Sequence, residues 1–176
     1  MNKKELITLL SEEKILKRKI DIFMKKKVVR FQEIDKNEIK GHIQKAEHNL
    51  RFVLDNIKLD YLDWAITGCY YSVYHSALAL ILKKGYVSKN HDATLCILVF
   101  EYYNKGLEDS DLELINDSFL NYQDFLFYVR YKDKREEASY STKILYNKEF
   151  VMMLRKKTIN FIDKVKNILD KEVLNE

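Results

Sequence analysis

The stretch at residues 60–83 constrains the fold most, because apolar side chains recur on nearly every side of the helix that it predicts. A helix of this kind lies at the centre of a bundle, where neighbouring helices cover it. We expect Asp60 to cap its start and Gly85 to mark its end. Its apolar side chains follow a spacing of three to four residues at Leu62, Ala65, Ile66, Cys69, Tyr70, Val73, Ala77, Leu80 and Ile81.

The same spacing predicts further helices on both sides of the central one. The chain contains no proline and only four glycines, which favours long uninterrupted helices. Asp35, with Glu38 in capping-box position, and Asn147 are expected N-caps. The expected helices cover residues 3–28 (one or two short helices), 36–58, 92–104, 111–134 and 147–173, with loops at 85–91 and 136–146. No strand-like alternation extends beyond four or five residues, so we expect an all-α antiparallel bundle of about five or six helices.

Positive charge is concentrated at the start of the chain. Residues 1–30 hold ten Lys or Arg against four acids, whereas the remainder holds 21 against 23. We therefore expect residues 1–35 to form a basic helical extension and residues 36–176 to form the bundle. A basic segment suits contact with nucleic acid or an acidic partner, although a solvated helix surface would carry the same charges.

Several functional classes lack their sequence signatures. The chain has no phosphate loop, dinucleotide fingerprint or zinc-protease helix, and Cys69 and Cys96 have neither metal nor disulfide spacing. We expect no cofactor or metal and two free thiols, with Cys69 buried. The first residues are polar and charged, and no apolar run reaches the length of a membrane span. These features predict a cytoplasmic protein without membrane contact.

Two segments carry the residues of greatest functional interest. The first begins with the run from Gly68 to Ala77 and ends with the pattern Lys-x-His at Lys89 and His91. It contains, in order, Tyr70-Tyr71, Tyr74-His75, Ala79-Leu80, Gly85 and Lys89-Asn90-His91. The second has the pattern Arg-x-x-Ala-x-Tyr at Arg135, Ala138 and Tyr140, before the last expected helix. In their order and spacing these segments resemble the HEPN domain family, over roughly residues 36–172.

The resemblance implies a helical bundle that pairs into a homodimer. Active members of the family are metal-independent RNases that use an arginine and a histidine with four to six residues between them, contributed by both protomers to one cleft. The histidine transfers a proton, and the arginine holds the phosphate. Similar domains are often paired with a minimal nucleotidyltransferase in a toxin–antitoxin-like system, which is the partner that the resemblance suggests.

This sequence departs from the RNase pattern, because four residues separate Arg135 from Tyr140, so that a tyrosine stands where the histidine would be. A phenol with a pKa near 10 is a poor base at neutral pH. We therefore expect a protein that binds a nucleotide, RNA or a partner without cleaving RNA. Arg135 would hold a phosphate and Tyr140 would stack on a base. The expected ligand-binding residues are Arg135, Tyr140, Tyr71, His75 and His91, and the catalytic candidates, if any, are Arg135, Tyr140 and His75.

Two other functions remain open from the residues alone. The protein could be an RNase in which Tyr140, His75 or His91 replaces the missing histidine. It could instead be an adaptor bundle that docks through the basic residues 3–30. Structural roles also compete with each site residue: Arg135 is followed by Glu136 and Glu137 as ion-pair partners, and buried tyrosines are commonly core or interface aromatics.

Overall fold

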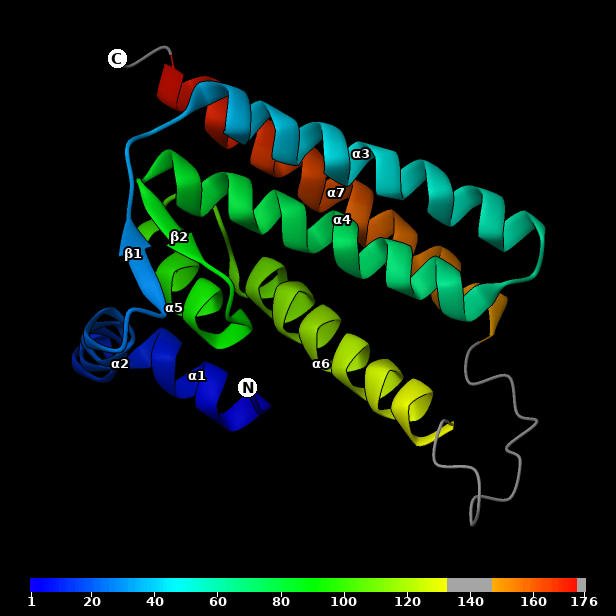
Figure 1. Cartoon of the computed structure of the whole chain (residues 1–176), viewed down its shortest axis with the longest axis horizontal. Coiled ribbons are helices and arrows are strands. Elements are labelled where there is room, and N and C mark those ends of the chain that lie inside the picture. Colours follow the sequence, from blue (N-terminus) through cyan, green and yellow to red (C-terminus); the bar gives the residue numbers. More distant parts are fainter. Residues whose placement is uncertain (133–146, 174–176) are drawn as a thin grey trace.

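The described residues form an all-α bundle with one small sheet (Figure 1). The computed structural model describes residues 1–132 and 147–173, without the side chains of 121, 123–132, 172 and 173. The helices within this part of the chain are α1 (Lys3–Ser11), α2 (Glu13–Lys25), α3 (Lys36–Lys58), α4 (Leu62–Lys83), α5 (His91–Tyr102), α6 (Asp109–Lys132) and α7 (Lys148–Val173). The strands are β1 (Val29–Phe31) and β2 (Tyr86–Ser88). The predicted all-α class is confirmed, and the segment at residues 3–28 forms two helices.

Helix α4 is the central helix, as its sequence predicts. It packs against α3, α5, α6 and α7, and side chains on every side of it are buried. By length and composition α4 could also cross a membrane, so the expectation that no apolar run is long enough was wrong. However, 78% of that apolar window is buried inside the protein, and the core helix of a folded bundle passes the same test.

Helices α3 and α4 approach each other closely at Gly68. A Cβ atom at this position would lie 2.7 Å from Val53 Cγ2 and 3.1 Å from Phe52 Cδ1. One turn further along α4, the buried Ser72 hydroxyl donates to the carbonyl oxygen of Ala46 on α3 at 3.0 Å. Glycine and serine on α4 therefore allow the two backbones to pack side by side along the long axis of the molecule (Figure 1).

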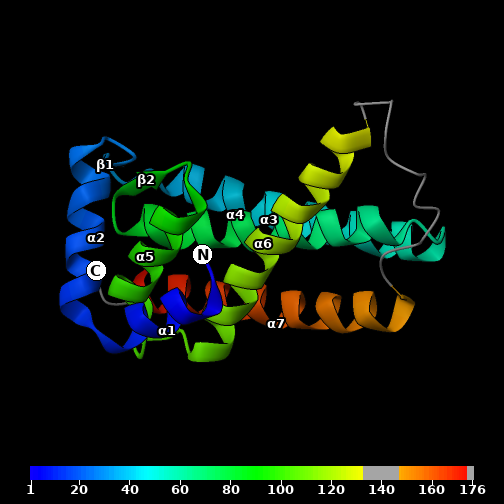
Figure 2. The same cartoon turned by 90° about the horizontal axis from the view of Figure 1, so that it is seen from below.

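The basic N-terminal segment packs on the bundle. Leu6, Leu9 and Leu16 are buried in the same hydrophobic cluster as residues of α4 and α5. Helix α2 contacts α5 directly, and Figure 2 shows α1, α2 and α5 gathered at one end of the molecule. Most of α2 is exposed, with only Leu16 buried, so its basic side chains remain on the surface. The boundary near residue 35 stays a prediction.

A two-stranded antiparallel ribbon replaces part of the loop expected at 85–91. Arg30 pairs with Val87, and Val29 pairs with Ser88. Val29 is 2% exposed and Ser88 is 4% exposed, so this cross-strand pair is buried against the bundle. A strand of three residues is too short to show an alternating pattern, which is why the sequence did not reveal it.

The helix caps correct the sequence predictions at two positions. Asp35 and Asn147 cap α3 and α7 as expected, each accepting from a backbone N–H in the first turn. Asp60 does not cap α4; it lies in the preceding turn with a φ of 63°, which aspartate tolerates better than most residues. Glu38 does not complete a capping box, because its carboxylate accepts from Gln32 Nε2 at 2.8 Å.

Candidate functional site

Four helices bring a group of aromatic and imidazole rings together around the middle of α4. We call it the tyrosine–histidine cluster. Its members come from α3 (His42), α4 (Tyr70, Tyr71, Tyr74 and His75), α5 (His91) and α6 (Phe119 and Tyr122). The four residues of α4 form two adjacent pairs one turn apart, and this places them on neighbouring faces of that helix.

Hydrogen bonds and ring stacking fix the cluster. The Tyr70 ring stacks on the Tyr122 ring with centroids 3.8 Å apart, and the His91 ring stacks on Phe119 at 4.3 Å. The Tyr70 hydroxyl lies 2.9 Å from His91 Nε2, and the Tyr71 and Tyr122 hydroxyls lie 2.8 Å apart. Helices α4, α5 and α6 are thereby joined through rings that each have a defined partner.

Two histidines form a direct hydrogen bond between α3 and α4. The Nδ1 atoms of His42 and His75 lie 2.8 Å apart. One Nδ1 must carry a proton and donate while the other accepts, so both rings cannot be imidazolium ions while this bond exists. This pair is a second polar link across the closest helix interface of the bundle.

The cluster is held in its uncharged form at neutral pH. Burial lowers the pKa of His75 to about 4, with smaller contributions from His42 and Lys45. Burial likewise lowers the pKa of His42 and of His91, against the opposing effects of Glu38 and Asp92 respectively. Burial also raises the pKa of the Tyr70 phenol, and the neighbouring tyrosines raise it further. The cluster therefore offers neutral hydrogen-bonding groups and no charged base or acid.

The structure brings together some of the residues that the sequence singled out. Tyr71, His75 and His91 all lie in the cluster. Tyr71 is hydrogen-bonded to Tyr122 of α6, His91 to Tyr70 of α4, and His75 to His42 of α3. Arg135 and Tyr140 lie outside the described residues, so their shared recess stays a prediction.

Sequence reasoning missed three members of the cluster, namely His42, Phe119 and Tyr122. Their partners lie on other helices, and no spacing along the chain signals such a contact. The only available signal for Phe119 and Tyr122 was their place on the apolar side of the predicted helix at 111–134.

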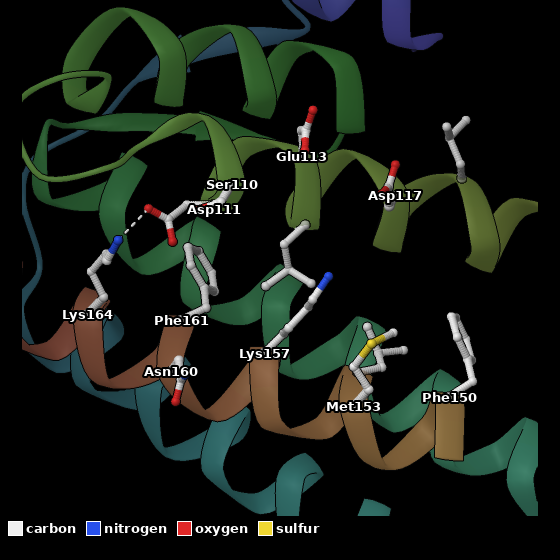
Figure 3. Close-up of a pocket in the computed structure, with 13 residues that line it drawn as sticks. Ser110, Asp111, Glu113, Asp117, Phe150, Met153, Lys157, Asn160, Phe161 and Lys164 are labelled. Atoms are coloured by element: carbon white, nitrogen blue, oxygen red, sulfur yellow. Dashed lines mark hydrogen bonds and ion pairs between the residues drawn. The ribbon is translucent and has the colours of Figure 1, made fainter. Parts of the chain in front are cut away.

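A groove of about 730 Å³ opens between α6 and α7 (Figure 3). Phe150, Met153 and Phe161 of α7 give it apolar surface. Glu113 and Asp117 project from α6 on one side, and Lys157 of α7 extends from the other (Figure 3). Lys164 is paired with Asp111 at 2.7 Å at one end. Because acidic side chains line the α6 wall, this groove does not suit a phosphate-bearing ligand.

The described side chains contain no group of three or more His, Cys, Asp or Glu residues arranged to hold a metal ion. Cys69 and Cys96 are buried, and burial raises the pKa of each thiol to about 12. Neither thiol is therefore disposed to act as a thiolate.

Comparisons with known proteins agree on one family. The model of the HEPN domain matches residues 39–168. A UPF0332 protein from Archaeoglobus fulgidus is 24% identical over 135 residues, which cover 77% of this chain and 98% of that protein. A protein of Methanocaldococcus jannaschii, named as a candidate toxin, is 31% identical over 107 residues, which cover 60% of this chain and 72% of that protein.

Proposed function

The chain belongs to the HEPN domain family, and from this premise we propose that it binds RNA without cleaving it. One observation carries the proposal: with four residues between it and Arg135, Tyr140 stands at a position where the RNase motif of the family requires a histidine. The arginine that would hold a phosphate is retained, while the imidazole that would transfer the proton is replaced.

The histidines of the tyrosine–histidine cluster are poorly suited to supply the missing proton-transfer group. His75 shares its Nδ1 hydrogen bond with His42, and His91 Nε2 lies against the Tyr70 hydroxyl. The pKa of each of these histidines is lowered by burial. A general base that acts near neutral pH needs a pKa near that pH and access to the substrate. This geometry supports binding in preference to the alternative of an RNase with a substituted catalytic residue.

The chemistry of the chain favours RNA as the ligand. The sequence pI of about 8.8 and the excess of basic residues at 1–30 would attract a polyanion. Tyr140 can stack on an unpaired base, which is how proteins commonly contact single-stranded RNA.

The test restores the family motif. Tyr140→His creates an arginine and a histidine with four residues between them, and we expect this variant to cleave oligouridine in the presence of EDTA while the natural chain only binds it. Cleavage would be followed on a gel, and binding by the fluorescence anisotropy of a labelled oligouridine. We expect Arg135→Ala to weaken binding about tenfold, because a charge-assisted contact to phosphate is lost.

A matched control separates restored chemistry from contamination. The double variant Arg135→Ala, Tyr140→His must lose the cleavage gained by Tyr140→His, and Tyr140→Phe must not cleave at all. Arg135-dependent cleavage by the natural chain would overturn the proposal in favour of an active RNase. Absence of RNA binding by the natural chain would overturn the binding function itself.

The toxin-named relative favours a further proposal, that the protein acts in a toxin–antitoxin-like pair with a minimal nucleotidyltransferase. The homodimer implied by the family would form the unit that this partner meets. Co-expression with a nucleotidyltransferase encoded beside this chain should yield a complex in which light scattering gives the mass of two copies of this chain plus its partner. Separate elution of the two proteins would contradict the pairing.

A further inference from the structure

The ribbon formed by β1 and β2 carries a small basic recess at the end of the molecule where α2 and α5 lie. The recess has a volume of about 290 Å³. Lys27, Val28 and Arg30 line one side, and residues 87–90 line the other. Three cationic side chains, Lys27, Arg30 and Lys89, contribute to it, and no acidic residue does. We call it the ribbon recess.

The strand register places two of these cations on one face of the ribbon. Residues paired directly across antiparallel strands point to the same side, and successive residues point to opposite sides. Val29 and Ser88 are paired and buried beneath the ribbon. Arg30, paired with Val87, therefore points outward, and Lys89, the residue after Ser88, continues along the same outer face. Val28 and Val87 supply the apolar base between these charges.

The three cations of the recess are not engaged in ion pairs, in contrast to five of the lysines elsewhere in the described chain. Lys3, Lys17, Lys58, Lys164 and Lys166 are all within ion-pair distance of a carboxylate. No such contact is found for Lys27, Arg30 or Lys89 among the described side chains. Their charge is therefore not neutralised locally, and it is available to an anion.

The backbone of Lys27 provides an independent observation. Its φ is 55°, the left-handed conformation that glycine normally supplies at the end of a helix. The N–H of Lys27 donates to the carbonyl of Met24, and the N–H of Val28 donates to that of Phe23, which together form a Schellman motif at the end of α2. The other described non-glycine residues with positive φ are Asp60 and Asn104, types that tolerate it. A lysine held here against its backbone preference points to a role for its side chain.

A second recess lined by lysines lies elsewhere, between the ends of α3, α4 and α7, but it contains a carboxylate and one of its lysines is already in an ion pair. Asp170 lines it, and Lys166 is paired with Glu47 at 2.8 Å. The ribbon recess has neither feature. Its placement is also favourable, because Lys89 lies two residues before His91, whose ring belongs to the tyrosine–histidine cluster.

We propose that the ribbon recess binds phosphate groups of the RNA backbone through Lys27, Arg30 and Lys89. This inference rests on the proposed RNA-binding function and adds a second contact site, far in sequence from Arg135 and Tyr140. The contacts are electrostatic and to the backbone, so they hold RNA irrespective of base sequence.

The sharpest test is Lys27→Gly. Glycine suits the left-handed backbone, so we expect the melting temperature to rise while RNA affinity falls about three- to tenfold. Arg30→Ala and Lys89→Ala should weaken binding by a similar factor. Each should also lower the dependence of log affinity on log salt by about 0.7 for single-stranded RNA. Lys156→Ala, which removes one exposed positive charge from α7, is the matched control and should bind like the natural chain.

A second measurement reads the recess without RNA. Titration with inorganic pyrophosphate should shift the backbone amide resonances of Val28 and Val87 in the natural chain, and the shift should be lost in Arg30→Ala. RNA binding that is equal in all variants, or pyrophosphate that leaves these amides unchanged, overturns the recess alone. Pyrophosphate binding without any RNA binding overturns the proposed function and leaves a phosphate site for another ligand.

Discussion

At the residue scale, the hydrogen bond between His42 and His75 makes the stability of the fold depend on the protonation state of these two rings. The bond requires one ring nitrogen to donate and the other to accept. The fold therefore favours neutral rings, in agreement with the lowered pKa of both histidines. The pair is placed where α3 meets α4, so loss of the bond acts on the closest helix contact in the bundle.

We expect the bundle to lose stability as the pH falls from about 6.5 to about 4, the interval between the ordinary pKa of histidine and that of His75. The folded pKa is the lower one, so in this interval the unfolded chain binds the proton first and is favoured. Thermal denaturation followed by circular dichroism should show the melting temperature dropping across this range. The drop should be smaller in His75→Gln.

His48→Gln is the control for this titration, since His48 is an exposed histidine of the same helix α3. It should show the same pH dependence as the natural chain. A steep drop that survives in His75→Gln would show that other groups are responsible.

At the scale of the element, the packing of α3 on α4 reverses the usual effect of a glycine in a helix. Glycine generally destabilises a helix interior relative to alanine. At Gly68 that cost is outweighed, because a methyl group would overlap the side chain of Val53 at 2.7 Å. At Gly41 on α3, by contrast, an added Cβ atom would have no neighbouring atom within 4 Å.

The two glycines therefore predict opposite responses to the same substitution. Gly68→Ala should lower the free energy of unfolding by about 1–3 kcal/mol through overpacking. Gly41→Ala should raise it by about 0.5–1 kcal/mol through helix propensity. Urea denaturation measures both. Stabilisation by Gly68→Ala would mean that α3 and α4 are not in the close contact described here.

At the scale of the whole molecule, the N-terminal helices share the core with the rest of the bundle. Leu16 of α2 is 3% exposed and belongs to the same hydrophobic cluster as α4 and α5. The single tryptophan, Trp64, is at the start of α4 and is 53% exposed. The start of α4 lies at the opposite end of the molecule from α2, so Trp64 reports on a part of the bundle distant from the N-terminal helices (Figure 1).

Leu16→Ala tests whether the basic segment and the bundle unfold together. We expect a loss of about 2–4 kcal/mol, as for other buried leucines. The urea transition seen by Trp64 fluorescence and the one seen by circular dichroism should shift equally, which is the signature of one cooperative unit. If the fluorescence transition stayed in place, the segment at residues 1–35 would unfold on its own.

Much of the helical framework could be predicted from the sequence, because helical periodicity is a local signal. The broad apolar stripe of residues 60–83 identified the central helix, and Asp35 and Asn147 marked two helix starts. The ribbon could not be predicted, since strands of three residues carry no measurable period. Asp60 was misassigned because aspartate is favoured both in turns and at helix N-caps, so its residue type does not distinguish the two.

The candidate site was only partly predictable, because its contacts join separate helices. Tyr71, His75 and His91 were found through the family pattern, whereas His42 and Tyr122 were not. Their positions depend on how helices cross, which no local pattern encodes. Arg135 and Tyr140, the residues on which the proposed RNA binding depends most, remain predictions from the motif.

The pairing of β1 with β2 also determines when the basic surface can appear during folding. The two strands are separated by the whole of α3 and α4, so joining them costs the entropy of closing a long loop, which the α3–α4 hairpin must first shorten. We therefore expect Arg30 and Lys89 to become neighbours only late in folding. A partly folded or truncated chain would contain the same cations but not their arrangement, so affinity for phosphate would distinguish the finished molecule from its intermediates.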